Sequence, residues 1–344
     1  MQEIERVFRT QANACAAMNS PIYGQLLERC ADDLAAGGLI ARLVADWQGE
    51  PVLDNVPLRL LGAAHYLALR GDAPLLAASL PSTGGRYEAG PAWSALSATL
   101  EQHAERVRIH LTEQIQTNEV RRCCALLGGF LTLARELPWP LRLLEIGASA
   151  GLNQCFDQFA YEFGAQRFGP SGAPLRLDCE WRGAPLDLRG DLRVASRRGC
   201  DIAPIDLHDP NAQLRLESFF WPDQLERLAR LRAACTCALK SGVSVEKMRA
   251  IDWLTRELAV VTPRQTTVLF HSVMWQYVPE VERKRIHALM SDRGAAATAV
   301  APLAWLRMEG RNYEHCEVRL RSWPSGEDRL LARCHYHGAW VEWL

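Results

Sequence analysis

Apolar side chains in the first part of the chain recur at the spacing of one helix face. Ser20, directly before a proline, is typical of a helix N-cap, and apolar residues then follow every three or four positions as far as Leu34. The same spacing predicts one long helix from Trp93 to Ile115 and another from Glu119 to Glu136. Strand-like alternation is missing from this part, so we predict an all-helical domain over residues 1–138.

Short apolar runs bounded by proline and glycine replace the helical pattern after Pro140. Leu141–Ile146 is the first of them and predicts a buried parallel strand. A Gly- and Pro-rich insertion at about 159–190 predicts a hairpin. Further strands are expected at 192–201, 243–245, 266–272, 297–307, 316–323 and 330–336, with helices near 221–240, 252–260 and 281–291. Residues 139–344 are therefore predicted to form an α/β domain whose sheet is mostly parallel with an antiparallel edge.

Charge and length exclude several classes of protein. The 39 basic and 40 acidic residues nearly cancel, so the excess of Lys and Arg that nucleic-acid binding needs is missing. The longest nearly apolar run, Ala295 to Leu306, is shorter than the roughly 20 residues that span a bilayer. The charged N-terminus does not resemble a signal peptide. We expect a cytoplasmic protein with a small-molecule substrate and neither nucleic-acid nor membrane partners, and we leave the oligomeric state open.

Eleven cysteines are present, and no pair has the spacing of a zinc finger. Reduced thiols in the cytoplasm fit this pattern best. The segment from Cys334 to His337 contains metal-binding residue types, but its alternation equally predicts a strand. We therefore predict no metal site.

The most informative motif follows the first predicted strand. That strand ends near an acid, Glu145, and a turn bounded by Gly147 and Gly151 leads into a helical segment, as in Rossmann nucleotide sites. Ser149 stands where a dinucleotide fingerprint has its middle glycine, which favours a cofactor without phosphate, S-adenosylmethionine, over NAD. The predicted cofactor-binding residues of this motif are Glu145, Gly147, Ala148, Ser149, Gly151 and Asn153.

The ends of two further strands carry polar candidates. Asp201, or as second choice Asp206, is expected to bind the ribose hydroxyls of an adenosine, although either acid can instead cap the loop that follows. His271 is the predicted general base and Tyr277 is grouped with it as catalytic. Trp275 is expected to stack on a planar substrate. A histidine at a strand end is equally often structural.

Five of the six residues from Gln116 to Arg121 are polar or charged, inside an otherwise amphipathic region. They are typical either of a seam between the helical and sheet halves or of a substrate site made by Asn118, Glu119 and Arg121. Both interpretations remain open at this point.

The motif Gly147–Gly151 also reads as the nucleophile elbow of α/β-hydrolases, with Ser149 as nucleophile and His271 or His337 as base. The helical upstream half offers no strand or Gly-rich loop for an oxyanion hole, which argues against this alternative. A ligand-binding protein without catalysis, and a turn without any ligand, are further alternatives.

Several segments, taken in order, resemble an uncharacterised bacterial family, domain of unknown function 2332, over nearly the whole chain. The matching segments are 116–119 with Arg121, 145–153, 199–206, 221–224, 271–272 with Tyr277, and 337–340. Arg122 stands where the family pattern leads us to expect a small residue. The resemblance implies a Rossmann-like fold related to class I methyltransferases and supplies no activity. Our leading hypothesis is an S-adenosylmethionine-binding methyltransferase acting on a small-molecule or peptide-like substrate, with the helical half as lid and substrate pocket.

Overall fold

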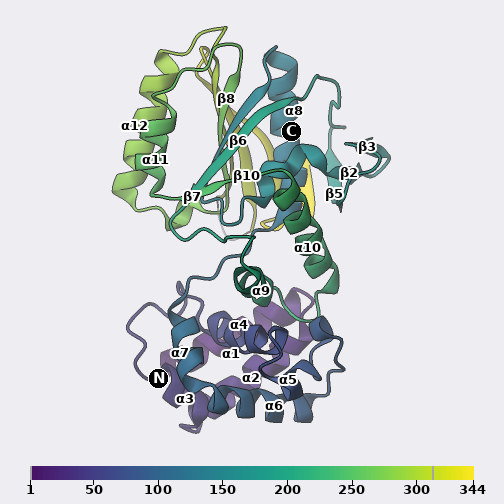
Figure 1. Ribbon diagram of the computed structural model, residues 1–344, viewed down its shortest axis with the longest axis vertical. Coiled ribbons are helices and arrows are strands. Elements are labelled where there is room, and N and C mark those ends of the chain that lie inside the picture. The colour runs from purple at the N-terminus through teal and green to yellow at the C-terminus, as the bar shows by residue number, and fades with distance from the viewer. Residues whose placement is uncertain (1, 312–313) are drawn as a thin grey trace. The chain divides into compact units, whose positions relative to one another are not determined.

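The computed structural model describes residues 2–311 and 314–344 (Figure 1). Two compact units divide the chain, one made of residues 1–117 and 206–230 and the other of residues 118–205 and 231–344. The helix α10 (Leu225–Lys240) begins in the range of the first unit and ends in that of the second.

The first unit is helical and is built around one apolar core. Its elements are α1 (Gln2–Ala17), α2 (Pro21–Ala35), α3 (Leu39–Val44), α4 (Val56–Leu69), α5 (Pro74–Ala77), the 3-10 turn η1 (Pro81–Thr83), α6 (Ala89–Gln102), α7 (Ala104–Thr112) and α9 (Pro210–Ser218). Phe8, Leu27, Leu60 and Leu100 are fully buried in its core, together with Trp221 from the later segment. The predicted helical N-terminal region is confirmed.

Two details of the first unit correct the sequence analysis. The long helix expected at 93–115 is two helices, because the backbone leaves the helical region at His103 (φ −112°, ψ 26°). Apolar positions on both helices still face the core, which is why the spacing continues across the break. The side chain of Ser20 does not cap α2. Its hydroxyl instead donates to Asp223 Oδ1 (2.6 Å), while Asp223 Oδ2 accepts from the Ile22 N–H (3.1 Å).

The second unit is α/β, with a large, mostly parallel mixed sheet. Its nine strands lie in the order β5-β12-β11-β10-β9-β8-β1-β6-β7. They are β1 (Leu141–Ile146), β5 (Glu180–Gly183), β6 (Val194–Asp201), β7 (Val245–Lys247), β8 (Thr266–Ser272), β9 (Leu303–Gly310), β10 (Cys316–Trp323), β11 (Glu327–Cys334) and β12 (Trp340–Trp343). The pairs from β7 to β9 are parallel, whereas β9 to β12 form an antiparallel meander. The predicted α/β class and antiparallel edge are confirmed.

Helices cover both faces of this sheet (Figure 1). The helix α8 (Cys123–Glu136), preceded by the turn η2 (Val120–Arg122), packs on one face, where Gly129 lies directly against Leu306 of β9. The helices α11 (Ala250–Glu257) and α12 (Glu280–Ala295) cover the other face and share a core with Leu144 of β1. Every residue of β1 and β8 is buried, as their largely apolar runs predict.

The region after β1 departs from a regular helix. The helical segment expected at 152–157 is the 3-10 helix η3 (Leu152–Gln158). The insertion forms a small sheet of β2 (Ala160–Phe163), β3 (Gln166–Phe168) and β4 (Arg176–Asp178), while β5 joins the edge of the main sheet beside β12. None of the described helices has the length and apolarity to cross a membrane.

Candidate functional site

The order of the strands reverses at β1. From β1 the chain continues to β6 on one side, whereas β8 pairs with the other side of β1. Open α/β sheets bind ligands at the carboxyl ends of two neighbouring parallel strands whose chain connections run to opposite sides of the sheet. The turn 147–151 follows β1, and the short 3-10 turn η4 (Trp275–Tyr277) follows β8. Both loops therefore lie at this edge of the sheet.

The turn after β1 alternates left-handed residues, with φ values of +62° at Gly147, +53° at Ser149 and +74° at Gly151. A left-handed conformation costs a non-glycine residue roughly 1 kcal/mol. At Ser149 a hydrogen bond helps to offset this cost, because its N–H donates to Asp201 Oδ2 at 2.8 Å. Asp201 Oδ1 accepts from the Ala203 N–H at 2.9 Å. Asp201 thus holds two turns together, as in the loop-capping alternative.

Glu145 lies buried beneath the turn, with 2 % of its surface exposed. Its Oε2 has no hydrogen-bond partner among the described residues. Burial raises the pKa of this carboxyl group well above its usual range, and the neighbouring Gln154 side chain opposes that shift only in part. Burial thus disfavours the charged form of Glu145, and its carboxyl group lies near the Gln154 side chain, whose own polar atoms also lack hydrogen bonds among the described residues.

The helical side of the turn is held by polar side chains. Asn118 Oδ1 accepts from the Leu152 N–H (2.9 Å) at the start of η3. Asn153 is 1 % exposed, and its Oδ1 accepts from the thiol of Cys123 (3.3 Å). Burial raises the pKa of that thiol well above its usual range, so it stays protonated and donates. At Gly151 an added Cβ would collide with Val243 and Val245, so glycine is needed for this close approach.

Glu119, Arg121 and Arg122 of the same segment also bind main chain. Glu119 accepts from the Arg121 N–H (3.2 Å), and Arg121 binds both the carbonyl (2.6 Å) and the carboxylate (3.0 Å) of Asp178. Arg122, which we did not predict as a site residue, is 8 % exposed. It donates to the carbonyls of Ser272 (3.2 Å) and Tyr336 (3.0 Å). This segment therefore supports both the turn after β1 and the end of β8.

His271 is fully buried, and both of its ring nitrogens are engaged. Nε2 accepts from the indole N–H of Trp305 (3.1 Å), so Nδ1 carries the proton that is shared with Glu309 Oε1 (2.6 Å). Trp275 stacks on the imidazole with ring centroids 4.9 Å apart. Tyr277 is 60 % exposed. Glu309 and Trp305 come from β9 and have no local motif that would have marked them.

Met274 lies directly over the turn after β1. A Cβ placed on Gly147 would stand 2.8 Å from both Cγ and Cε of Met274. The carboxylate of Glu309 accepts from the N–H groups of Met274 (3.3 Å) and Trp275 (3.2 Å). No local pattern in the sequence indicates this close contact.

The chain as a whole matches one protein family. Residues 5–343 match the family described as an uncharacterized protein conserved in bacteria, DUF2332. The chain belongs to this family. Neither a curated protein nor a solved structure matches it.

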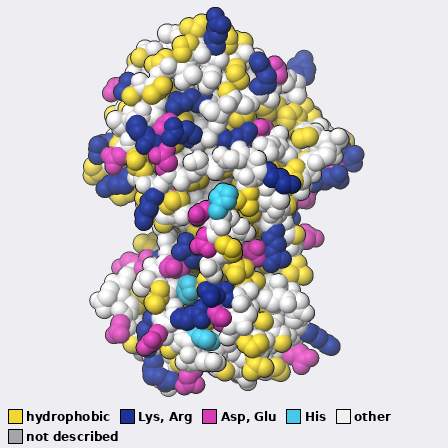
Figure 2. Space-filling model, viewed as in Figure 1, with side chains coloured by type: hydrophobic (Ala, Val, Ile, Leu, Met, Phe, Trp, Pro, Cys, Tyr) yellow, Lys and Arg dark blue, Asp and Glu magenta, His cyan; other side chains and the backbone are white. Residues whose placement is uncertain are grey.

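Some predicted residues of this DUF2332 protein lie outside the turn and its supports. Asp206 is exposed, belongs to the first unit, and accepts from the His208 N–H (2.9 Å) in its own turn. No group of three or more metal-ligating side chains occurs within residues 2–311 and 314–344. On the face shown in Figure 2, basic and acidic side chains are interspersed.

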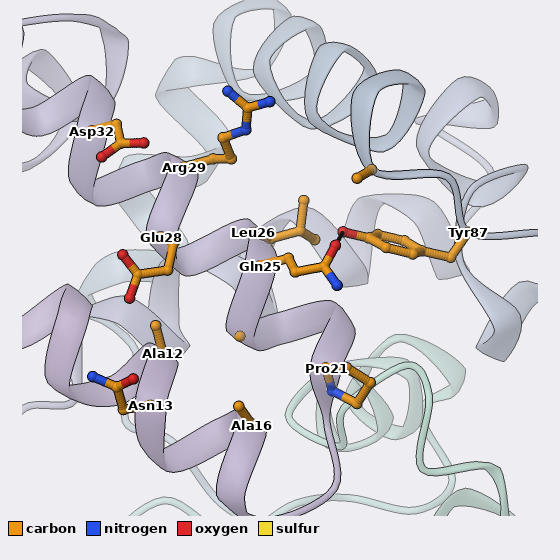
Figure 3. A pocket seen from close by; sticks show the side chains of 12 residues that line it. Ala12, Asn13, Ala16, Pro21, Gln25, Leu26, Glu28, Arg29, Asp32 and Tyr87 are labelled. Carbon is orange, nitrogen blue, oxygen red and sulfur yellow. Dashed lines mark hydrogen bonds between the residues drawn. The ribbon is translucent and has the colours of Figure 1, made fainter.

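The first unit of this DUF2332 protein has a groove of about 500 Å³ along α1 and α2 (Figure 3). The Tyr87 hydroxyl reaches Gln25 Oε1 across it at 3.1 Å. Glu28, Arg29 and Asp32 border the groove, and small residues such as Ala12 and Ala16 line it. It contains none of the predicted cofactor-binding, substrate-binding or catalytic residues.

Proposed function

We propose that the second unit binds S-adenosylmethionine at the carboxyl ends of β1, β6 and β8 and transfers its methyl group to a small-molecule or peptide-like substrate. The parallel part of the sheet supports this proposal. Numbered by their order along the chain, the strands β7-β6-β1-β8-β9 read 3-2-1-4-5, which is the order of doubly wound nucleotide-binding sheets. The finer assignment to a Rossmann-like class I methyltransferase fold belongs to the same proposal.

The observation that carries the proposal is the buried, unpartnered Oε2 of Glu145 beneath a turn of alternating left-handed residues. A carboxyl group in a site of low polarity gains most from a cationic partner, because ionisation alone would leave a buried charge. S-adenosylmethionine carries a sulfonium and an ammonium group and no phosphate. Its adenosyl and methionyl parts fit a turn that lacks the middle glycine of a dinucleotide site.

The chain's own residues then act mainly through position. Glu145 orients the cationic part, the turn held by Asp201 and Asn118 keeps its shape, and exclusion of water aids an in-line displacement. His271 has no free ring nitrogen in this arrangement, so we assign it to holding the loop rather than to proton transfer. Trp275 and the exposed Tyr277 lie within the loop after β8 and are the proposed substrate contacts.

Isothermal titration calorimetry with S-adenosylmethionine, S-adenosylhomocysteine and NAD tests the proposal. We expect the two adenosyl compounds to bind and NAD not to bind. In Glu145→Gln, affinity for S-adenosylmethionine should fall about tenfold. Affinity for S-adenosylhomocysteine, which has an uncharged thioether in place of the sulfonium, should fall by less if the carboxyl group faces the sulfonium. Glu327→Gln, an exposed acid of the same unit, is the matched control and should leave both affinities unchanged.

A serine hydrolase remains the main competing outcome of that experiment. Ser149 has the positive φ of a nucleophile elbow, yet no strand of its sheet comes from the described residues before 118. Labelling by a fluorophosphonate that is lost in Ser149→Ala, with no heat of binding from either adenosyl compound, would refute the methyltransferase.

A further inference from the structure

Val273, the first residue of the segment Val273–Trp275, has an unfavourable backbone conformation. Val273 has φ +52°, which is a genuine outlier for a β-branched residue because its Cβ crowds the backbone. Strained residues of this kind persist only where their surroundings fix them, and they cluster at ligand clamps and switches. The cost of the positive φ at Val273 therefore favours conformations of the segment in which this residue has a negative φ.

The Val273 N–H donates to the Met308 carbonyl at 2.9 Å, and Glu309 fixes the two residues that follow. Its carboxylate accepts from the Met274 and Trp275 N–H groups at 3.3 and 3.2 Å and binds His271 Nδ1 at 2.6 Å. Trp305 donates to the other nitrogen of His271, so the imidazole cannot turn away without losing two hydrogen bonds. Trp275 stacks on that imidazole.

The fixed segment places the side chain of Met274 against Gly147. Since a single added carbon at Gly147 would lie 2.8 Å from the methionine, no ligand atom fits between the two residues. The unbranched side chain of methionine has three rotatable bonds and adapts to a change in its own backbone. A small change in the backbone of 273–275 would therefore allow Met274 to move off Gly147.

We propose that Val273–Trp275 is a latch over the turn after β1, held closed by Glu309 and biased toward opening by the strain at Val273. This inference rests on the proposed function, because it makes the latch the gate of the adenosyl site. A ligand that binds only the open form has its affinity reduced by the fraction of molecules that are open. Glu309 and His271 act as positioning residues in this scheme.

Two neighbouring substitutions should change S-adenosylmethionine affinity in opposite directions. Met274→Ala removes the group that covers Gly147, and we expect the dissociation constant to fall about fivefold. Val273→Gly relieves the strain of the closed form, which outweighs the added chain freedom of glycine, so the dissociation constant should rise about threefold. Met248→Ala, a partly buried methionine packed against the same core, is the control and should have no effect. A change of the dissociation constant in the same direction in both variants would overturn the latch.

Hydrogen exchange of the Met274 and Trp275 amides provides a readout that needs no ligand. Both amides should be protected in the natural chain and should exchange at least tenfold faster in Glu309→Ala, which removes both acceptor oxygens, whereas Glu317→Ala should leave them unchanged. Equal exchange in the natural chain and in Glu309→Ala would refute the latch whatever the ligand does. Protection as expected, with no adenosyl binding even by Met274→Ala, would instead overturn the proposed function and with it the role of the latch at that site.

Discussion

Two acids at neighbouring strand ends have opposite environments. Each carboxylate oxygen of Asp201 accepts a hydrogen bond from a main-chain N–H group, at 2.8 and 2.9 Å. Glu145 is more deeply buried and leaves Oε2 without a partner in the described part of the chain. Hydrogen bonds to a carboxylate favour its charged form, whereas burial disfavours it. The sequence marks both acids as candidates. Only the surrounding backbone shows that Asp201 binds main-chain N–H groups, whereas Glu145 keeps one oxygen without a hydrogen bond among the described residues.

The raised pKa of Glu145 predicts a pH-dependent effect of Glu145→Gln on stability. Between the unfolded pKa, about 4.3, and the higher folded pKa, the folded protein keeps a proton that the unfolded chain releases, so its stability falls as pH rises. Glutamine has nearly the same shape and does not titrate. Thermal unfolding should show a gain in melting temperature for the variant that is small at pH 4.5 and grows by pH 8. A gain that is the same at every pH would contradict the assignment of a neutral Glu145.

At the scale of elements, local sequence patterns predicted individual strands and turns but not the contacts between them. The strands β1 and β8 follow from short, largely apolar runs, and the turn 147–151 follows from its glycines. Glu309 and Met274 escaped prediction because their roles depend on partners brought close by the sheet. The break at His103 was also missed, since the apolar face continues across it.

The contact between β1 and α11 includes a buried ion pair. Arg142 Nη2 lies 2.9 Å from Glu257 Oε2, and the two side chains are 10 % and 4 % exposed. Glu257 also pairs with Arg198 and Arg256 on the same side of the sheet. Burial lowers the pKa of Arg142, while the carboxylate of Glu257 raises it. Glu257 thus has further countercharges, whereas Glu257 is the acid that neutralises Arg142 among the described residues.

Glu257→Gln should therefore destabilise the protein by about 3 kcal/mol, because it leaves Arg142 buried without a countercharge. The double variant Arg142→Met, Glu257→Leu should recover most of that loss, since two apolar side chains need no pairing. Urea unfolding monitored by circular dichroism measures both effects. Asp187→Asn, which breaks exposed pairs with Arg189 and Arg135, is the control and should cost less than about 1 kcal/mol. An equally large loss in the double variant would show that the ion pair itself is not the cause.

At the scale of the molecule, the chain returns to its first unit after β6. Residues 206–230 lie between two strands of the second unit in sequence, yet they belong to the helical unit. Trp221 joins the helical core, and the Ser218 carbonyl lies 3.0 Å from His65 Nδ1. The apolar pattern of this segment predicts helices but not the core that they complete. Contacts separated by more than 150 residues lie beyond what local spacing can indicate.

Residues 1–117 should accordingly fail to form their native structure alone, because they lack Trp221 and the carboxylate of Asp223 that accepts from the start of α2. We expect the fragment to keep part of its helix content, bind a hydrophobic dye and unfold without a sharp transition. Joining residues 206–230 to it through a flexible linker should restore a cooperative transition in circular dichroism. Asp223→Ala in the joined fragment should then cost about 1 kcal/mol, the usual effect of losing a helix-capping acceptor. Cooperative unfolding of residues 1–117 by themselves would instead mean that the helical core is complete without residues 206–230.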